Sequence, residues 1–304
     1  MRMIWEMFEG KNPEARKPGL WNMWRAPIPV TGWKRWWPRM VRASLGILLM
    51  HSLTAAQSGG GAQASSGPYE ATPQRPTFTS DTSTTAPGTL ELEVGTTSWR
   101  GFFALPVTVK YTPDVGRGLF HRAEFSLTFD ALTSVEETSR RATRFGDRLG
   151  FAVRRPVYRG ETLSVAVVPQ ALFFLRGDRG ARLGLTGIMV YGMGLNSLTV
   201  NGTWTSATHP SATNPAQQYD VAVDVARTLG ESGPRSRWTV FGGLLYENPS
   251  HRAAAVSLGQ GVTYRFRPNW VLDFAVRQLG LAAGRRDYQI LAGFTVNLGR
   301  PSDW

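Results

Sequence analysis

The side chains of this sequence that could carry out chemistry are charged residues spaced two positions apart. Glu91 and Glu93, for example, alternate with Leu90, Leu92 and Val94. A strand with this pattern presents its charges on one face and its apolar side chains on the other. Charges of both signs recur on such faces, which favours pairing between neighbouring strands over a filter for ions of one sign. The candidates are Glu91, Glu93, Lys110, Arg122, Glu124, Arg148, Asp220, Asp224, Arg265, Asp273 and Arg277.

Metal binding and nucleophilic catalysis have little support in the sequence. His121, His209 and His251 have no neighbouring ligand at the spacing of a metal site. A hydrolase needs a serine, a histidine and a third orienting group, and neither His121 near Ser126 nor His251 beside Ser250 supplies this set. We therefore predict no enzyme activity, no metal and no cofactor.

The elements that position the charges are most evident in the last fifty residues. The segments Ala255–Arg267, Trp270–Leu279 and Asp287–Leu298 each alternate with a period of two. One face of each is apolar, and the other carries Arg, Asp, Asn or Gly, as in a sheet with one apolar and one wet side. Aromatic residues at the ends of the apolar rows are typical of the interfacial girdles of a membrane barrel: Tyr264, Phe266, Trp270 and Tyr288.

The same alternation predicts twelve strands. Most of them reach the length of about 9–11 residues that a membrane-spanning strand needs, and no helical period of useful length interrupts them. The predicted strands are 89–99, 102–112, 119–130, 145–155, 161–174, 181–191, 193–205, 217–228, 236–247, 253–267, 270–279 and 287–298.

Closure of these strands into a barrel would turn the polar face into the wall of a lumen. In lipid every backbone polar group must be paired, so the sheet must close, and twelve strands leave room for a narrow lumen. The wall charges then either select which solutes pass or serve only to stabilise the wall by pairing between strands. Arg265 and Asp273 lie diagonally across a predicted turn at 268–269, close enough to pair.

The number of strands also predicts which side of the membrane the termini and the connections face. An even number places both termini on one side, which is the periplasmic side in outer-membrane barrels. Two long polar connections, Ala131–Arg144 and Ser206–Ala216, are then expected on the outer side.

Composition narrows the class of protein. The chain has 304 residues and no cysteine, which excludes disulfides and thiol chemistry. Its net charge of +12 is uneven, because residues 1–42 hold nine basic and three acidic residues, a net charge of +6. The rest is spread through strands and turns rather than gathered in a stripe, so we predict no nucleic-acid partner.

The residues before the barrel resemble an export signal. Val41-Arg42 precedes the apolar run Ala43–Ala56, which is shorter than the roughly 20 residues of a membrane-spanning helix. We expect a signal peptide over 40–64, with cleavage after either of two small-residue motifs ending at Ala56 or Ala64. Residues 1–39 are then an upstream extension or a long n-region, so translation starts at Met1 or Met40. The alternative is a cytosolic chain with a hydrophobic N-terminal helix.

Residues 65–88 are predicted to be a linker and a possible lumen segment. The stretch Arg75–Asp81, with Arg75, Thr79 and Asp81, could fold back into the lumen as a plug whose arginine meets a wall carboxylate. A disordered periplasmic tail is the alternative.

Several short motifs, in order along 74–298, resemble a known family. They are Arg75-Pro76-x-x-Thr79, Pro87-Gly88, Leu90-Glu91-Leu92-Glu93-x-Gly95, Leu272-Asp273-Phe274 and Tyr288-Gln289-Ile290. Together they resemble the bacterial outer-membrane barrels labelled transporter-like, or "putative MetA-pathway of phenol degradation". Gln74 and Thr77 depart from the acidic residues usual there. The resemblance implies an outer-membrane barrel that passes small, often aromatic or hydrophobic, compounds.

The sequence thus predicts an all-β fold: a closed, antiparallel, up-and-down transmembrane β-barrel of about twelve strands over 89–298, preceded by a signal peptide and flexible linker and followed by a tail at 299–304. We expect passive passage of small molecules, with outer-membrane lipid and a small solute as partners. A structural or adhesive barrel and a soluble secreted β-sandwich are the alternatives. Solute identity, pore radius and oligomeric state stay open.

Overall fold

The computed structural model describes residues 69–303, apart from 76, 117, 119, 138–139, 177–179, 212–213, 231–236 and 282–286. The predicted upstream extension and signal peptide lie outside the described residues. Among the described residues, no helix has the length and apolar character needed to cross a bilayer.

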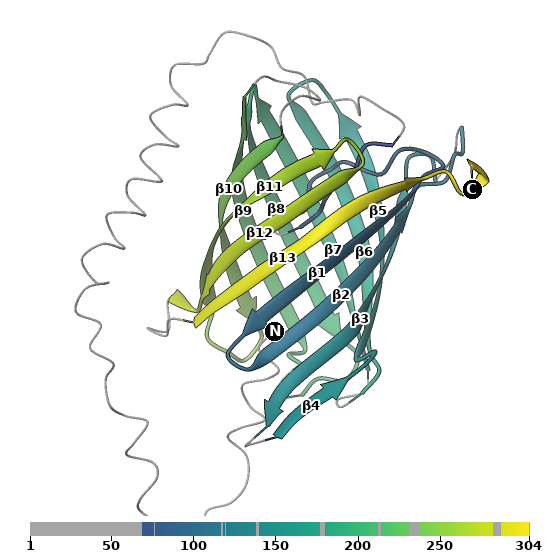
Figure 1. Cartoon of the computed structure of the whole chain (residues 1–304). Coiled ribbons are helices and arrows are strands. Elements are labelled where there is room, and N and C mark those ends of the chain that lie inside the picture. Colours follow the sequence, from purple (N-terminus) through teal and green to yellow (C-terminus); the bar gives the residue numbers. More distant parts are fainter. Residues whose placement is uncertain are drawn as a thin grey trace, which may run out of the picture. The chain divides into compact units, whose positions relative to one another are not determined.

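Almost all regular structure in the described part of the chain is β-strand (Figure 1). The strands are β1 (Leu90–Trp99), β2 (Phe102–Tyr111), β3 (Glu124–Glu137), β4 (Arg140–Arg144), β5 (Arg148–Arg159), β6 (Leu163–Phe174), β7 (Gly180–Met193), β8 (Asn196–Ala207), β9 (Gln217–Leu229), β10 (Trp238–Pro249), β11 (Ala255–Arg267), β12 (Trp270–Leu279) and β13 (Asp287–Gly299). A 3-10 turn, η4 (Pro301–Asp303), follows the last strand.

The sheet closes on itself. Successive strands pair antiparallel around the ring, β2 pairs with β3, and β1 pairs with β13 through register partners such as Val94 and Phe294. The short β4 pairs with the far end of β3. Within the described residues the result is a closed antiparallel barrel of twelve strands plus this side hairpin, which confirms the predicted fold class. One closed sheet also contradicts the alternative of a two-layer sandwich.

The two faces of the barrel differ in polarity, as the alternation predicts. Outward-facing apolar side chains are exposed: Leu272 by 45%, Phe274 by 47% and Ile290 by 50%. Inward-facing residues of the neighbouring strands, such as Asp273 and Thr295, are buried. The barrel therefore has an apolar outside and a largely polar interior.

Strand bounds agree best where the alternation is regular. The predicted bounds of β1, β2 and β12 agree with the structure to within one residue. The main difference concerns Ala131–Arg144, predicted as a loop. Here β3 continues and turns back through β4, with Val135 opposite Ala142. The sequence here mixes polar and apolar residues without a period of two, so the hairpin has backbone pairing without the hydrophobic alternation by which strands are recognised.

Candidate functional site in the barrel interior

Most of the predicted wall residues face the interior. Glu91, Glu93, Lys110, Glu124, Arg148, Asp220, Asp224, Arg265, Asp273 and Arg277 lie on the inward face of their strands. The exception is Arg122, which is exposed in the turn before β3 and has a φ of 58°. That left-handed backbone cannot continue a strand, so β3 begins at Glu124 and the prediction for Arg122 is wrong.

Residues Tyr69–Thr89, which we call the lumen segment, run through the interior of the barrel apart from residue 76, which is not described (Figure 1, dark blue coil). The Lys110 ammonium on β2 donates to the carbonyl oxygen of Thr72 at 2.9 Å. The backbone N–H of Thr79 donates to Asp224 on β9 at 2.7 Å. Because β2 and β9 lie on opposite sides of the ring, a short segment that reaches both must cross the lumen.

The lumen segment doubles back on itself. Gln74 Nε2 donates to Asp81 Oδ1 at 2.9 Å, and the backbone N–H of Asp81 donates to Gln74 Oε1 at 3.0 Å. We call the residues between them, Arg75–Ser80, the tip. The flanking parts, Tyr69–Gln74 and Asp81–Thr89, are the first and second legs.

Four wall carboxylates share one role: each accepts a hydrogen bond from a backbone N–H of the lumen segment. The N···O distances are 2.7 Å from Thr72 to Glu91, 2.6 Å from Gln74 to Glu93, 2.7 Å from Thr79 to Asp224 and 2.8 Å from Thr85 to Glu124. Bonds from N–H groups to ionised acceptors are about twice as strong as neutral ones. Each of these four carboxylates therefore holds the backbone of the segment.

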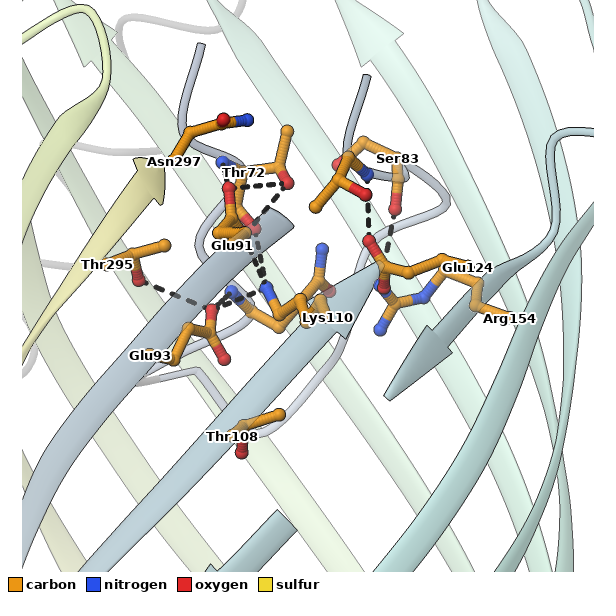
Figure 2. Close-up of polar contacts among 12 residues, drawn as sticks. Thr72, Ser83, Glu91, Glu93, Thr108, Lys110, Glu124, Arg154, Thr295 and Asn297 are labelled. Atoms are coloured by element: carbon orange, nitrogen blue, oxygen red, sulfur yellow. Dashed lines mark hydrogen bonds and ion pairs between the residues drawn. The ribbon is translucent and has the colours of Figure 1, made fainter. Parts of the chain in front are cut away.

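At the first leg, a buried lysine lies between two of these carboxylates. Lys110 Nζ is 2.8 Å from Glu91 and 2.7 Å from Glu93, and its side chain is 2% exposed. Thr72 Oγ1 also donates to Glu91 at 3.1 Å, and Thr295 Oγ1 to Glu93 at 3.3 Å. Figure 2 shows the cluster beneath the first leg. Buried charges persist when they are paired and hydrogen-bonded, and the segment supplies part of that pairing.

At the second leg, Arg154 on β5 is 2.7 Å from Glu124 and donates to the carbonyl oxygen of Ser83 at 3.3 Å (Figure 2). The hydroxyls of Thr82 and Ser164 on β6 are 2.6 Å apart. Arg154 is not among the predicted wall residues. Its signal was present, because Arg154 has the same strand parity as Arg148, which was predicted to line the wall.

The tip contacts the wall through an aromatic ring and an arginine. Arg277 Cζ lies 4.5 Å from the centre of the Phe78 ring, and Arg277 Nη2 donates to the carbonyl oxygen of Thr77 at 2.7 Å. The ring rests on Gly259 of β11, where an added Cβ would lie 2.7 Å from Phe78 Cε2. A larger residue at Gly259 would occupy the place of the ring.

Arg75 lies against Gly95 of β1, where an added Cβ would overlap its guanidinium at 1.3 Å. Its Nη2 donates to the carbonyl oxygen of Thr96 at 3.4 Å, and its charge attracts the Asp273 carboxylate. Arg265 forms an ion pair with Glu70 of the first leg rather than the predicted pair with Asp273. Glu70 reaches Arg265 because the first leg passes beside the β11–β12 turn, where Ala71 N donates to Pro268 O at 3.0 Å.

Both ends of the lumen segment lie near the C-terminal residues. Tyr69 donates its hydroxyl to Asp303 at 2.6 Å, and this hydrogen bond raises the pKa of Tyr69. An added Cβ on Gly88 would lie 3.5 Å from Arg300 Nε. The segment thus enters and leaves the lumen at the same end of the barrel.

His121 and Ser126, considered above as a possible pair, each contact a backbone carbonyl instead. His121 Nδ1 is 2.8 Å from the carbonyl oxygen of Val115, and Ser126 Oγ donates to the carbonyl oxygen of Ala152 at 3.3 Å. Among the described residues no group of three His, Asp or Glu side chains is placed to hold a metal.

No protein family model and no curated protein matches the sequence. Among solved structures, the chain is similar to the NanC porin with 11% identity over 68% of this chain and 98% of that one, at a TM-score of 0.48. It is similar to the KdgM porin with 10% identity over 68% and 98%, at a TM-score of 0.47. An anion-selective porin from Comamonas acidovorans has 10% identity over 69% and 98%, at a TM-score of 0.37.

Proposed function

We propose that this protein is an outer-membrane channel for the passive passage of small solutes. The observation that carries the proposal is the contrast between an exposed apolar outer face and a largely polar inner face within a closed ring. Water-soluble proteins rarely expose contiguous apolar patches above a few hundred Å², whereas a closed barrel in lipid requires such a surface. The predicted girdle residue Phe266 is 54% exposed on this surface.

We further propose that the inward-facing charges line the pore and that the lumen segment plugs it. The segment crosses between opposite walls, and its backbone is held by four carboxylates. Within the predicted plug residues, Arg75 and Thr79 contact the wall directly, whereas Asp81 bonds Gln74 at the base of the tip. Solute passage then requires that the tip, or the whole segment, leaves its place.

The solute class favoured by the family resemblance is small aromatic or hydrophobic molecules. The support for this class is the place of the Phe78 ring, between the Arg277 guanidinium and Gly259. A neighbouring inward cluster of Phe241, Ala275 and Leu291 is apolar. An aromatic solute could take the position that Phe78 vacates, with Arg277 again over the ring.

The export prediction completes the proposal. A channel of this kind reaches the outer membrane after cleavage of a signal peptide, for which 40–64 is our candidate. N-terminal sequencing of the mature protein tests this directly: a first residue at Gln57 or Ser65 supports it, and an intact Met1 or Met40 contradicts it.

Single-channel recording with the full chain and with a variant lacking residues 70–87 tests the channel and the plug. Because both ends of the segment lie beside the C-terminal residues, this deletion can be closed without stretching β1. We expect a larger and steadier conductance in the deletion variant. Equal conductance contradicts the plug, and no conductance or solute flux in either protein contradicts the channel and favours a structural or adhesive barrel.

Membrane extraction is the matching test of location. An outer-membrane barrel stays in the membrane pellet at high salt and needs detergent for release. Release by salt alone contradicts the membrane placement.

A further inference from the structure

Two glycines on neighbouring strands form a trough in the inner wall of the barrel. Gly95 on β1 is the register partner of Gly293 on β13, and Gly293 is the partner of Asp273 on β12. Gly95 and Asp273 are both buried on the inward face of their strands, so the three residues form one inward row across three strands. Glycine inside a strand often marks a place where another group approaches the backbone closely.

The guanidinium of Arg75 lies in this trough. A Cβ added to Gly95 would be 1.3 Å from Arg75 Nη1 and 1.9 Å from Arg75 Cζ, so the guanidinium occupies the place of a side chain. At the next position of the row, a Cβ added to Gly293 would be 3.0 Å from Asp273 Oδ2. Opposite side-chain positions on paired strands are about 4.5–5.5 Å apart. The guanidinium and the carboxylate therefore lie at neighbouring positions of one row.

The Asp273 carboxylate depends on Arg75 for its pairing. Asp273 is 6% exposed, and its Oδ1 has no hydrogen-bond partner within the described part of the chain. The charge of Arg75 attracts it, whereas the charge of Glu93 repels it. Arg277, farther along β12, is attracted by Asp224. When the tip leaves the wall, Asp273 thus becomes a buried carboxylate without its cation, which is a costly state.

We propose that this trough, with Gly95 and Gly293 as its floor and Asp273 at its end, is a binding site for solutes that carry a guanidinium group, and that such a solute competes with Arg75 for it. This inference rests on the proposed channel and plug and names a further solute class for the lumen. A guanidinium is flat, and its N–H donors form a fixed fork that matches a carboxylate, whereas an ammonium is a compact, strongly hydrated charge. A side chain at Gly95 would fill the trough, so shape as well as charge favours a guanidinium.

Titration calorimetry with methylguanidinium tests the site in Arg75→Ala, a full-length variant whose trough is vacated. We expect methylguanidinium to bind this variant several-fold more tightly than it binds the unmodified chain, in which Arg75 fills the trough, and several-fold more tightly than methylammonium does. In the same background, Asp273→Asn removes the charge and Gly95→Ala fills the trough, so each should weaken binding several-fold. Gly150→Ala is the matched control, because its Cβ meets Leu172 and Thr128 at an ordinary 3.6 Å, and it should leave binding unchanged.

Two further measurements address access and competition. The 70–87 deletion variant removes the whole tip from the trough, so it should show the same preference for methylguanidinium over methylammonium. In single-channel recordings of the unmodified chain, methylguanidinium should raise the opening frequency several-fold, because it displaces Arg75, and methylammonium should not.

The outcomes separate this inference from the channel itself. The site is overturned if neither Arg75→Ala nor the deletion variant prefers methylguanidinium, or if the preference survives Asp273→Asn, and conductance by these variants would leave the channel in place. Binding without any change in opening frequency overturns the competition with Arg75. If no variant conducts, the channel is overturned, while the calorimetric titration still decides whether the trough binds a guanidinium.

Discussion

The legs and the tip of the lumen segment are held to the wall in different ways. The carboxylates under the legs are themselves paired, Glu91 and Glu93 with Lys110, and Glu124 with Arg154. The tip instead relies on single contacts from Asp224, Arg277 and the Thr96 carbonyl, and on the ring of Phe78.

This difference separates anchoring from gating. Removing one member of a wall pair under the legs, such as Lys110, leaves a buried charge without its partner, which is costly, and Lys110 also holds the Thr72 carbonyl. Releasing the tip breaks a few hydrogen bonds of about 0.5–1.5 kcal/mol each, or about 1.5–3 kcal/mol where a charged group takes part. The tip is thus the part that can move while the legs keep their place, and substitutions in the two parts should have different effects.

The largest effect is expected at the anchor. Lys110→Met leaves Glu91 and Glu93 buried without their cation, so we expect the free energy of unfolding to fall by about 3–5 kcal/mol, measured by urea denaturation in detergent micelles. The variant that also carries Glu91→Gln and Glu93→Gln removes the unpaired charges and should recover much of the loss. A loss below about 1 kcal/mol, the scale of an exposed pair, would show that the cluster does not anchor the leg.

A smaller effect on stability, but a large one on conductance, is expected at the tip. In Gly259→Val the new side chain takes the place of Phe78, since even its Cβ would be 2.7 Å from the ring. Overpacking typically costs about 1–3 kcal/mol. We expect this cost to destabilise the docked tip, so that the channel opens more often in single-channel recordings.

Gly242→Val is the matched control for this substitution. Its added Cβ would meet only the carbonyl oxygen of Gly259, at an ordinary 3.8 Å, so the opening frequency should stay near that of the unmodified chain. Equal gains in the two variants would mean that the barrel was perturbed as a whole.

The smallest effect is expected at the base of the tip. Gln74→Ala removes both side-chain hydrogen bonds with Asp81 but keeps the backbone N–H that Glu93 accepts. A loss of about 1–2 kcal/mol corresponds to a factor of about 5–30 in an equilibrium, so we expect opening to become several-fold more frequent with unit conductance unchanged. Gln217→Ala at the barrel rim should leave opening unaffected. A drop in unfolding free energy as large as that of Lys110→Met would remove the distinction between anchor and tip.

The barrel was predictable from the sequence because its faces repeat every second residue. This repeat places Glu91, Asp224 and Asp273 inward without knowledge of their partners. It fails where the sequence has no regular alternation, as in the β3–β4 hairpin, and where a turn replaces a strand, as at Arg122.

The bonds that hold the lumen segment were not predictable in the same way. Every residue except proline has a backbone N–H, so the sequence does not mark Thr72 or Thr85 as the donors that meet a carboxylate. The path of the segment decides this. The idea that Arg75 turns into the lumen came from its charge alone, whereas its position on Gly95 needs the three-dimensional arrangement of β1.

The place of β13 beside the first leg has a consequence for assembly. Asn297 Nδ2 donates to the Glu70 carbonyl at 3.2 Å, and Thr295 bonds Glu93, which also holds the Gln74 N–H. The last strand to be synthesised therefore completes the seat of a segment that precedes the first. Until β13 pairs with β1, the lumen segment lacks these contacts. Closure of the barrel therefore fixes the β1–β13 pair and the docked segment in the same step.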